Sequence, residues 1–162
     1  MILYHGSTIV VDEPKVLISE RLVDFGAGVY TTANREQAVR WAQRVSVRRK
    51  VAEQIINEYE FDLDIAEKEL RVLRFDEPDR TWLEFVCANR SGRDTDELYD
   101  VVFGPVANDT VYAVVQFYEN GIYDIEEAIK RLKVQTLYNQ ILFHTDKALT
   151  FCKYKGFENI GG

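Results

Sequence analysis

The sequence contains little cysteine, histidine or proline: its 162 residues include 2 Cys, 2 His and 3 Pro. Two cysteines cannot form the disulfide framework of a small secreted domain. We therefore interpret Cys87 and Cys152, each in an apolar segment predicted to be helical, as buried free thiols. Together with His5 and His144 they lack the spacing of zinc ligands, so we expect no structural zinc site and no bound metal.

Long apolar runs are also missing. The longest, such as residues 101–103 and 111–115, span only a few positions, whereas a bilayer-spanning helix needs about 20 apolar residues. The first residues lack the basic and apolar regions of a secretory signal. These absences predict a cytoplasmic protein that makes no membrane contact.

Positive charge is in deficit, with 20 Lys and Arg against 27 Asp and Glu and a net charge of −7. This balance argues against general electrostatic adhesion to nucleic acid, but it allows a local basic patch. Arg40, Arg44 and Arg48 recur every four residues and are followed by Arg49 and Lys50. Two interpretations stay open for this stripe, a solvated helix face and a surface that contacts phosphates.

Apolar residues, by contrast, are plentiful enough for one core. They make up 46% of the chain and include 9 Tyr, 9 Phe and 2 Trp, which excludes global disorder. No internal repeat, low-complexity tract or flexible linker divides the sequence. A chain of about 150 residues usually forms one domain, so we predict a single domain over residues 1–162.

Strand and helix patterns are interspersed along the chain. The capping-box forms Asn34-x-x-Gln37 and Asp124-x-x-Glu127 each predict a helix start, and Gly104-Pro105 predicts a turn. Alternation and apolar content predict strands over residues 2–5, 55–61, 71–75, 99–103, 137–143 and, at an edge, 154–160, with further helices over 65–70, 82–89, 111–118 and 146–152. The irregular connections favour an α+β fold with mostly antiparallel strands.

Three separated segments contain residues that can bind a ligand: residues 3–7 (Leu-Tyr-His-Gly-Ser), 24–30 (Asp-Phe-Gly-Ala-Gly-Val-Tyr) and 137–143 (Leu-Tyr-Asn-Gln-Ile-Leu-Phe). The second begins like a dinucleotide-binding fingerprint, but Thr31 stands at the third glycine position and no helix opens there. Together the three segments resemble the catalytic domains of the ADP-ribosyltransferase superfamily. The resemblance is to the branch with a His on the first strand, a Tyr after a glycine turn and a late Glu, which includes the poly(ADP-ribose) polymerases.

The chain is more closely similar to a family of small bacterial domains of undefined function in the same superfamily. These domains share the Asp-Phe-Gly turn, a Gln-Ala-x-x-Trp-Ala helix such as residues 37–42 and a loop such as residues 104–109. The resemblance implies two packed, mainly antiparallel sheets with flanking helices. It also implies an enzyme that takes NAD as its substrate, breaks the nicotinamide–ribose bond and transfers one ADP-ribose to a protein or nucleic-acid acceptor. Small bacterial proteins of this type are often toxins, which implies an antitoxin protein as partner.

The His5-Gly6-Ser7 segment has a chemical rationale for this role. Gly6 lacks a side chain, so its backbone N–H and C=O can approach the nicotinamide carboxamide, while the imidazole of His5 and the hydroxyl of Ser7 can hydrogen-bond ribose hydroxyls. The structural alternative is a strand end followed by a Gly-Ser turn, with a hydrogen-bonded core histidine.

Aromatic rings are expected to hold the nicotinamide. Tyr30 follows the glycine turn and offers a ring face for stacking, and by resemblance Trp41 is a second stacking ring, although it also lies on the apolar stripe of its helix. Ala38 stands where the polymerases have a Ser that hydrogen-bonds the carboxamide. Arg21, before the glycine turn, is expected to meet the NAD pyrophosphate.

Gln140 is the main departure from the resembled pattern, because the polymerases have Glu there. An amide can hydrogen-bond and orient the reacting ribose, but it supplies no negative charge near the developing cation. We therefore expect single transfer by His5, Tyr30 and Gln140 rather than chain elongation. Two alternatives stay open: a catalytically inactive module that binds NAD or ADP-ribose or another protein, and a nucleic-acid-binding protein that uses the arginine stripe.

Overall fold

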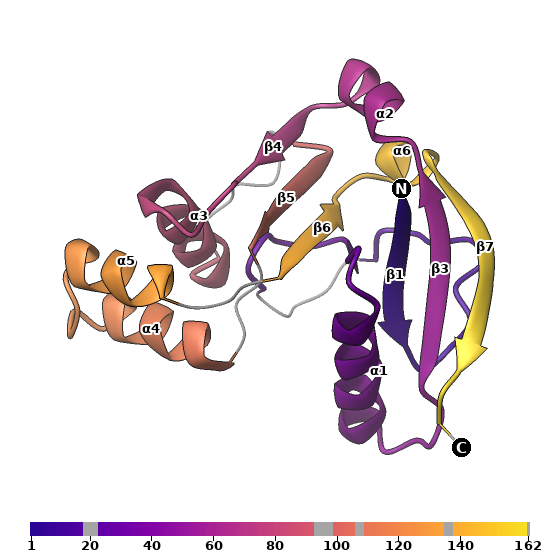
Figure 1. Ribbon diagram of the computed structural model, residues 1–162, viewed down its shortest axis with the longest axis horizontal. Coiled ribbons are helices and arrows are strands. Elements are labelled where there is room, and N and C mark those ends of the chain that lie inside the picture. The colour runs from indigo at the N-terminus through magenta and orange to yellow at the C-terminus, as the bar shows by residue number, and fades with distance from the viewer. Residues whose placement is uncertain (18–22, 93–98, 106–108, 135–137, 162) are drawn as a thin grey trace.

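The computed structural model describes residues 1–17, 23–92, 99–105, 109–134 and 138–161, in which seven strands and six helices alternate irregularly (Figure 1). The strands are β1 (Ile2–Ser7), β2 (Val29–Thr31), β3 (Ile55–Phe61), β4 (Val72–Arg74), β5 (Val101–Pro105), β6 (Asn139–Phe143) and β7 (Cys152–Asn159). The helices are α1 (Arg35–Arg49), α2 (Leu63–Glu69), α3 (Arg80–Arg90), α4 (Asp109–Glu119), α5 (Ile125–Lys133) and α6 (Asp146–Leu149). The predicted class, α+β with two mainly antiparallel sheets and flanking helices, is confirmed.

The first sheet has the strand order β1-β3-β7 and is antiparallel throughout. Its central strand is β3, whose predicted bounds of 55–61 match the structure. Helix α1 packs on one face of this sheet, close to β1 (Figure 1). Asn34 caps α1, and its side chain accepts a hydrogen bond from the Gln37 backbone N–H at 3.0 Å.

The second sheet has the order β2-β6-β5-β4. Its pairs are antiparallel except β4 with β5, which run parallel and are joined through α3. One face of this sheet packs against the first sheet, where Leu3 and Phe61 meet Ile141 and Phe143 in one apolar cluster. The rings of Phe61 and Phe143 are 5.0 Å apart and nearly perpendicular.

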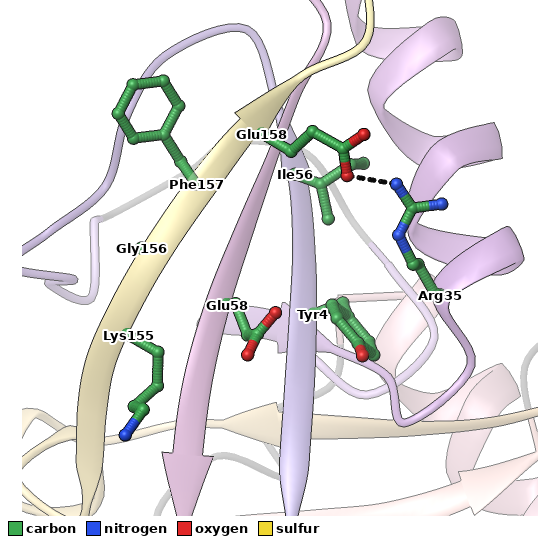
Figure 2. Close-up of a pocket in the computed structure, with 8 residues that line it drawn as sticks. All are labelled: Tyr4, Arg35, Ile56, Glu58, Lys155, Gly156, Phe157 and Glu158. Carbon is green, nitrogen blue, oxygen red and sulfur yellow. Dashed lines mark hydrogen bonds and ion pairs between the residues drawn. The ribbon is translucent and has the colours of Figure 1, made fainter.

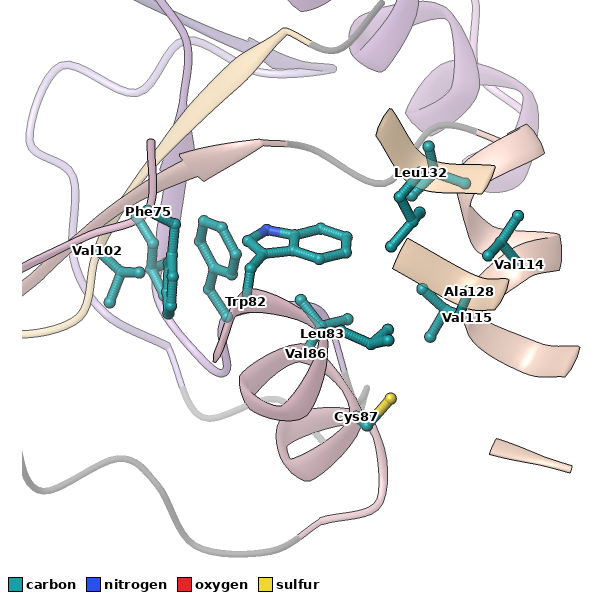
Figure 3. Packing of buried hydrophobic residues seen from close by; sticks show 13 residues of the cluster. Phe75, Trp82, Leu83, Val86, Cys87, Val102, Val114, Val115, Ala128 and Leu132 are labelled. Carbon is teal, nitrogen blue, oxygen red and sulfur yellow. The ribbon is translucent and has the colours of Figure 1, made fainter. Parts of the chain in front are cut away.

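The other face of the second sheet is covered by α3, α4 and α5, which gather on the side remote from the first sheet (Figure 1). Trp82 is fully buried between these helices and the sheet, as Figure 3 shows, with Phe75 on one side and Leu132 on the other. Its indole Nε1–H donates to the Pro105 carbonyl at 3.0 Å, which satisfies its only polar atom.

Some predicted elements were wrong in position. Gly104 and Pro105 continue β5 instead of forming a turn, because Gly104 pairs with Gln140 and the site of a Gly104 side chain is filled by Phe25 and Phe75. Cys152 is a free thiol as predicted, but it opens β7 and is only half-buried, not buried in a helix. Burial still raises its pKa to about 12, so the thiol stays protonated at neutral pH. Residue 137, predicted to begin a strand, lies outside the described residues.

Candidate functional site

The three segments that the sequence predicts to bind a ligand lie on or lead into three neighbouring strands. Strand β1 meets the end of β2 through an isolated antiparallel bridge, in which Tyr4 and Thr32 exchange backbone hydrogen bonds of 2.8 and 3.0 Å. Strand β2 then pairs with β6, with Tyr30 opposite Leu142. The His-Gly-Ser segment, the glycine-turn tyrosine and the late glutamine are therefore adjacent where the two sheets join.

His5 bridges this junction from β1. Its Nδ1 lies 2.7 Å from the backbone oxygen of Tyr30. A carbonyl can only accept, so Nδ1 carries the proton and, in the neutral ring, Nε2 is left as an acceptor. Burial lowers the pKa of His5 below its ordinary 6.5, while the bond to Tyr30 acts in the opposite sense. The side chain is therefore a neutral imidazole with a fixed tautomer.

Gly6 is a contact point between β1 and α1. A Cβ atom at this position would lie 2.2 Å from the Ala38 carbonyl oxygen and 2.7 Å from the Ala42 nitrogen. Backbone groups of successive strand residues point to alternate edges. Those of Tyr4 point toward β2, so the N–H and C=O of Gly6 point toward the same edge. The side-chain position is thus taken by α1, while the backbone groups face the β2 side.

Ser7 is buried at the end of β1, on the strand face that also carries His5. Its Oγ accepts a long hydrogen bond of 3.4 Å from the backbone N–H of Ile9. Just beyond it, Arg49 at the end of α1 donates to the Thr8 hydroxyl at 2.9 Å. These contacts hold the chain after β1 against the last turn of α1.

The glycine turn before β2 is held closed by Tyr30. The Tyr30 hydroxyl donates to the Gly26 carbonyl at 2.7 Å and accepts from the Phe25 backbone N–H at 3.1 Å. Gly26 has a φ of 90°, which L side chains rarely adopt. Arg90 of α3 adds a hydrogen bond of 2.7 Å to Asp24. The phenol is therefore a structural anchor, and its half-buried ring packs beside the core around Trp82.

Gln140 lies on β6 opposite Gly104 and is only 2% exposed. It shares a face with Tyr30, because Tyr30 pairs with Leu142 and side chains two residues apart point the same way. Its side-chain Nε2 has no hydrogen-bond partner within the described part of the chain. A buried donor without a partner costs about 1–3 kcal/mol of folding free energy. We therefore expect an acceptor from outside the chain to bind Gln140 Nε2.

Because side chains alternate between the two faces of a strand, the predicted site residues fall on two different faces. Tyr30 and Gln140 lie on the face of the second sheet that continues into the Gly6 face of β1, through the pair Tyr4 and Thr32. His5 and Ser7 leave β1 toward its other face, and His5 reaches the junction only at the Tyr30 backbone. Arg21 lies outside the described residues.

Trp41 is half-buried on α1, and its Cβ would lie 3.1 Å from a side chain placed at Gly6. The helix thus brings Trp41 next to the His-Gly-Ser segment, on the Gly6 face of β1. Both the apolar-stripe interpretation and the stacking interpretation of Trp41 are compatible with this position. Arg40, one residue earlier, holds its guanidinium 5.2 Å from the ring centroid of Tyr138, just before β6.

A family model described as "Protein of unknown function (DUF3990)" matches residues 1–154 of the chain. The chain belongs to the DUF3990 family. Neither a curated protein nor a solved structure matches it. The match agrees with the expected membership of a family without a defined function, and the wider superfamily resemblance stays a proposal.

A separate pocket of the DUF3990 chain lies between α1 and β7, on the side of α1 that carries Arg35. Figure 2 shows Arg35 reaching from α1 to Glu158, with which it forms an ion pair. Lys155 and Glu58 also line this pocket, which has a volume of about 180 Å³. Its two positive and two negative side chains balance, so it offers no net attraction to a diphosphate. We therefore place the candidate site at the strand junction.

The sequence interpretation missed Gln37, which is 3% exposed on the first turn of α1. The capping-box pattern predicts that its side chain bonds the Asn34 backbone N–H. That N–H instead donates to the Thr32 hydroxyl at 3.0 Å. Of the two capping-box hydrogen bonds, only the one from the Gln37 backbone N–H to the Asn34 side chain forms. Both amide atoms of Gln37 are left without a partner among the described residues. The only signal in the sequence was the residue type at this position.

Within the described residues, no helix has both the length and the apolar character that a bilayer crossing requires. The same residues contain no group of three or more His, Cys, Asp or Glu side chains that could hold a metal ion.

Proposed function

We propose that this domain is an NAD-dependent mono-ADP-ribosyltransferase whose site lies at the junction of β1, β2 and β6. The observation that best supports the proposal is the adjacency of the three segments on neighbouring strands, joined by the Tyr4–Thr32 bridge and by His5 bound to Tyr30. Segments more than a hundred positions apart in the sequence thereby lie on neighbouring strands, with Gly6, Tyr30 and Gln140 on one continuous face and His5 joined to it through the Tyr30 backbone.

In this proposal the His-Gly-Ser segment binds the donor. The N–H and C=O of Gly6, which point toward β2, form two hydrogen bonds with the nicotinamide carboxamide. His5 Nε2 accepts from a ribose hydroxyl, because Nδ1 holds the ring proton in its bond to Tyr30. The Ser7 hydroxyl uses a lone pair toward Ile9, so its proton can be donated to a second ribose oxygen.

The rings of Tyr30 and Trp41 stack on the nicotinamide and hold the glycosidic bond in position. In the reaction, the bond between C1′ of the ribose and the ring nitrogen breaks, and its electron pair goes to the nitrogen of the departing neutral nicotinamide. A nucleophile of the acceptor forms the new bond to C1′ and releases a proton to water. The transition state resembles an oxocarbenium ion, as in glycoside cleavage.

Gln140 orients the reacting ribose through its side-chain amide. Its Nε2 lacks a partner among the described residues, so it can donate to a ribose oxygen. A neutral amide cannot act as a general base toward a growing chain of ADP-ribose, so transfer stops after one unit. The proposed acceptor is a protein or nucleic acid of the cytoplasm, and the proposed regulator is an antitoxin protein.

The test is to incubate the purified chain with NAD labelled in its adenylate phosphate and with cell lysate. We expect nicotinamide release and label in the macromolecular fraction. Gln140→Ala should slow nicotinamide release about a hundredfold, because an unoriented ribose reaches the reactive geometry less often. The matched control is Asn139→Ala, a neighbouring exposed amide on the same strand, which should leave turnover unchanged.

Two results would reject the proposal. The first is wild-type protein that does not bind NAD, and the second is Gln140→Ala protein that is folded and turns NAD over normally. Saturable NAD binding with neither nicotinamide release nor label transfer would instead support a binding module. The neutral Gln140 favours that second candidate, because it removes the charge that would stabilise the developing cation.

The arginine stripe concerns the acceptor. Arg40, Arg44 and Arg48 are exposed along α1 and line a groove of about 360 Å³. If the acceptor is a nucleic acid, its binding should weaken steeply as salt rises, because phosphate contacts release counterions. Nucleic-acid binding without any NAD affinity would favour the third candidate, a nucleic-acid-binding protein.

A further inference from the structure

Two glutamine side chains are almost completely buried and lack partners within the described residues. Gln37 has neither a donor for its Oε1 nor an acceptor for its Nε2, and Gln140 has no acceptor for its Nε2. Their exposed fractions are 3% and 2%. Most buried polar atoms in proteins are hydrogen-bonded, so two such amides in one small domain require an explanation.

The packing of α1 places Gln37 on the side of the helix that faces β2 and β6. Ala38 and Ala42 rest on Gly6, which centres the helix over β1. Arg35 pairs with Glu158 of β7 on one flank. With 100° between successive helical residues, Gln37 and Trp41 lie on the other flank.

Two observations place Gln140 near this flank. The register of β2 with β6, continued by one residue past Thr31, sets residue 32 beside Gln140. Thr32 is bridged to Tyr4, so one continuous strand face leads from β1 to Gln140. Helix α1 covers the β1 end of that face, and α3, α4 and α5 cover its other end. Arg40 of α1 also lies over the ring of Tyr138, two residues before Gln140. Both unpartnered amides therefore belong to the same junction.

We propose that Gln37 is a substrate-binding residue whose amide pairs with the nicotinamide carboxamide of NAD. This inference rests on the proposed function and adds a residue to the same site. A carboxamide has two lone pairs on its oxygen and two N–H donors, so one of each remains after the two bonds to Gly6. The Gln37 amide lacks both a donor partner and an acceptor partner among the described residues and can hydrogen-bond these remaining groups. Gln37 thereby takes over the contact that Ala38 cannot make.

The test uses Gln37→Met, which keeps the side-chain length and removes both polar atoms. Affinities for NAD and for nicotinic acid adenine dinucleotide, in which a carboxylate replaces the carboxamide, are measured by calorimetry. The wild-type protein should bind NAD more tightly than the acid analogue. Gln37→Met should bind NAD about tenfold to a hundredfold more weakly and lose this preference.

The stability of Gln37→Met is a second readout. A purely structural role for the amide predicts that its removal lowers stability, whereas a ligand-binding role does not. Removal of an unpartnered buried amide should leave the urea midpoint of Gln37→Met unchanged or raise it. A strongly lowered midpoint would show that the amide is bonded within the protein and would overturn the inference. The control Gln116→Met, at an exposed position on α4, should change neither affinity nor preference.

The remaining outcomes separate the two proposals. Wild-type protein that binds NAD, together with a Gln37→Met protein of equal affinity and equal preference, would overturn the role of Gln37 and leave the proposed function standing. Wild-type protein with no affinity for NAD would overturn both. Loss of NAD binding in a variant as stable as wild type, with the preference abolished, would support both.

Discussion

At the scale of single residues, the junction is defined by polar side chains in apolar surroundings. His5 is held neutral with its Nδ1 proton on the Tyr30 carbonyl, and Gln37 and Gln140 are buried without partners among the described residues. Each of these arrangements costs folding free energy, because water would hydrogen-bond the same groups. Such costs are typical of sites that a ligand completes.

The lowered pKa of His5 predicts how stability depends on pH. The unfolded protein binds a proton on this ring near pH 6.5, whereas burial in the folded state opposes protonation. The contribution of the neutral ring to the free energy of unfolding is therefore complete above pH 6.5 and is lost as the pH falls through the lower folded-state pKa. Urea unfolding between pH 7.5 and 5 should show this loss.

The variant His5→Gln tests the assignment, because an amide can still donate to the Tyr30 carbonyl but does not titrate. We expect its stability to fall less between pH 7.5 and 5 than that of the wild type. His144→Gln controls for the loss of a histidine at another position. Equal pH dependence in the wild type and His5→Gln would show that His5 is not the responsible group.

At the scale of elements, the close approach of α1 to β1 positions the residues of the proposed site. The helix rests on the bare Cα of Gly6, and this contact brings Trp41 and the Gln37 flank over the strand junction. Strand β2 is only three residues long and depends on the turn that Tyr30 closes. The proposed site is therefore built from a helix and three strand ends, and small residues such as Gly6 set their spacing.

Gly6→Ala should separate α1 from β1. The added methyl group would lie 2.2 Å from a helix carbonyl, which rigid backbone atoms cannot accommodate without moving the helix. We expect the free energy of unfolding to fall by about 1–3 kcal/mol, the usual cost of overpacking, and NAD binding to be lost. Urea unfolding and calorimetry measure the two effects.

Gly156→Ala is the matched control, because a Cβ there meets nothing within 4 Å although the φ of 150° is unfavourable for alanine. It should show a backbone cost of about 1 kcal/mol and unchanged NAD affinity. If Gly6→Ala bound NAD as tightly as the wild type, the proposed site at the β1–α1 contact would be wrong.

At the scale of the whole molecule, two apolar layers share the second sheet. One layer joins the sheets to each other, and the other attaches α3, α4 and α5 through Trp82. The strand junction lies where the sheets meet, and the helical layer packs beside it on the face of the second sheet that carries Tyr30 and Gln140.

Trp82 should therefore be a major determinant of stability. Trp82→Ala is expected to lower the free energy of unfolding by about 3–5 kcal/mol, through the lost burial and the cavity left behind. Trp82→Phe should cost less, about 1–3 kcal/mol, mainly because the Pro105 carbonyl loses its donor. Thr81→Ala, an exposed neighbour on α3, should stay within about 0.5 kcal/mol of the wild type. Equal urea midpoints for Trp82→Ala and Thr81→Ala would contradict this role.

Local chemistry was sufficient for the elements whose signals lie within a few residues. Asn34 and Asp124 cap α1 and α5 as predicted, and the bounds of β3 follow from its β-branched and aromatic residues. Caps and alternation depend on neighbouring residues, which is why the sequence alone determined these elements and the α+β class. It also indicated which three segments form the proposed site, because together they resemble segments of the ADP-ribosyltransferase superfamily.

Tertiary structure alone decided the rest. Gly104 and Pro105 have the residue types of a turn, but pairing with β6 extends them as strand. Gln37 has the residue type of a capping box, but Thr32 takes the hydrogen bond that would have satisfied it. Whether a polar atom finds a partner depends on strands and helices that are distant in sequence, and no local pattern contains that information. The burial of Gln37 and Gln140 at one junction is therefore a property of the fold.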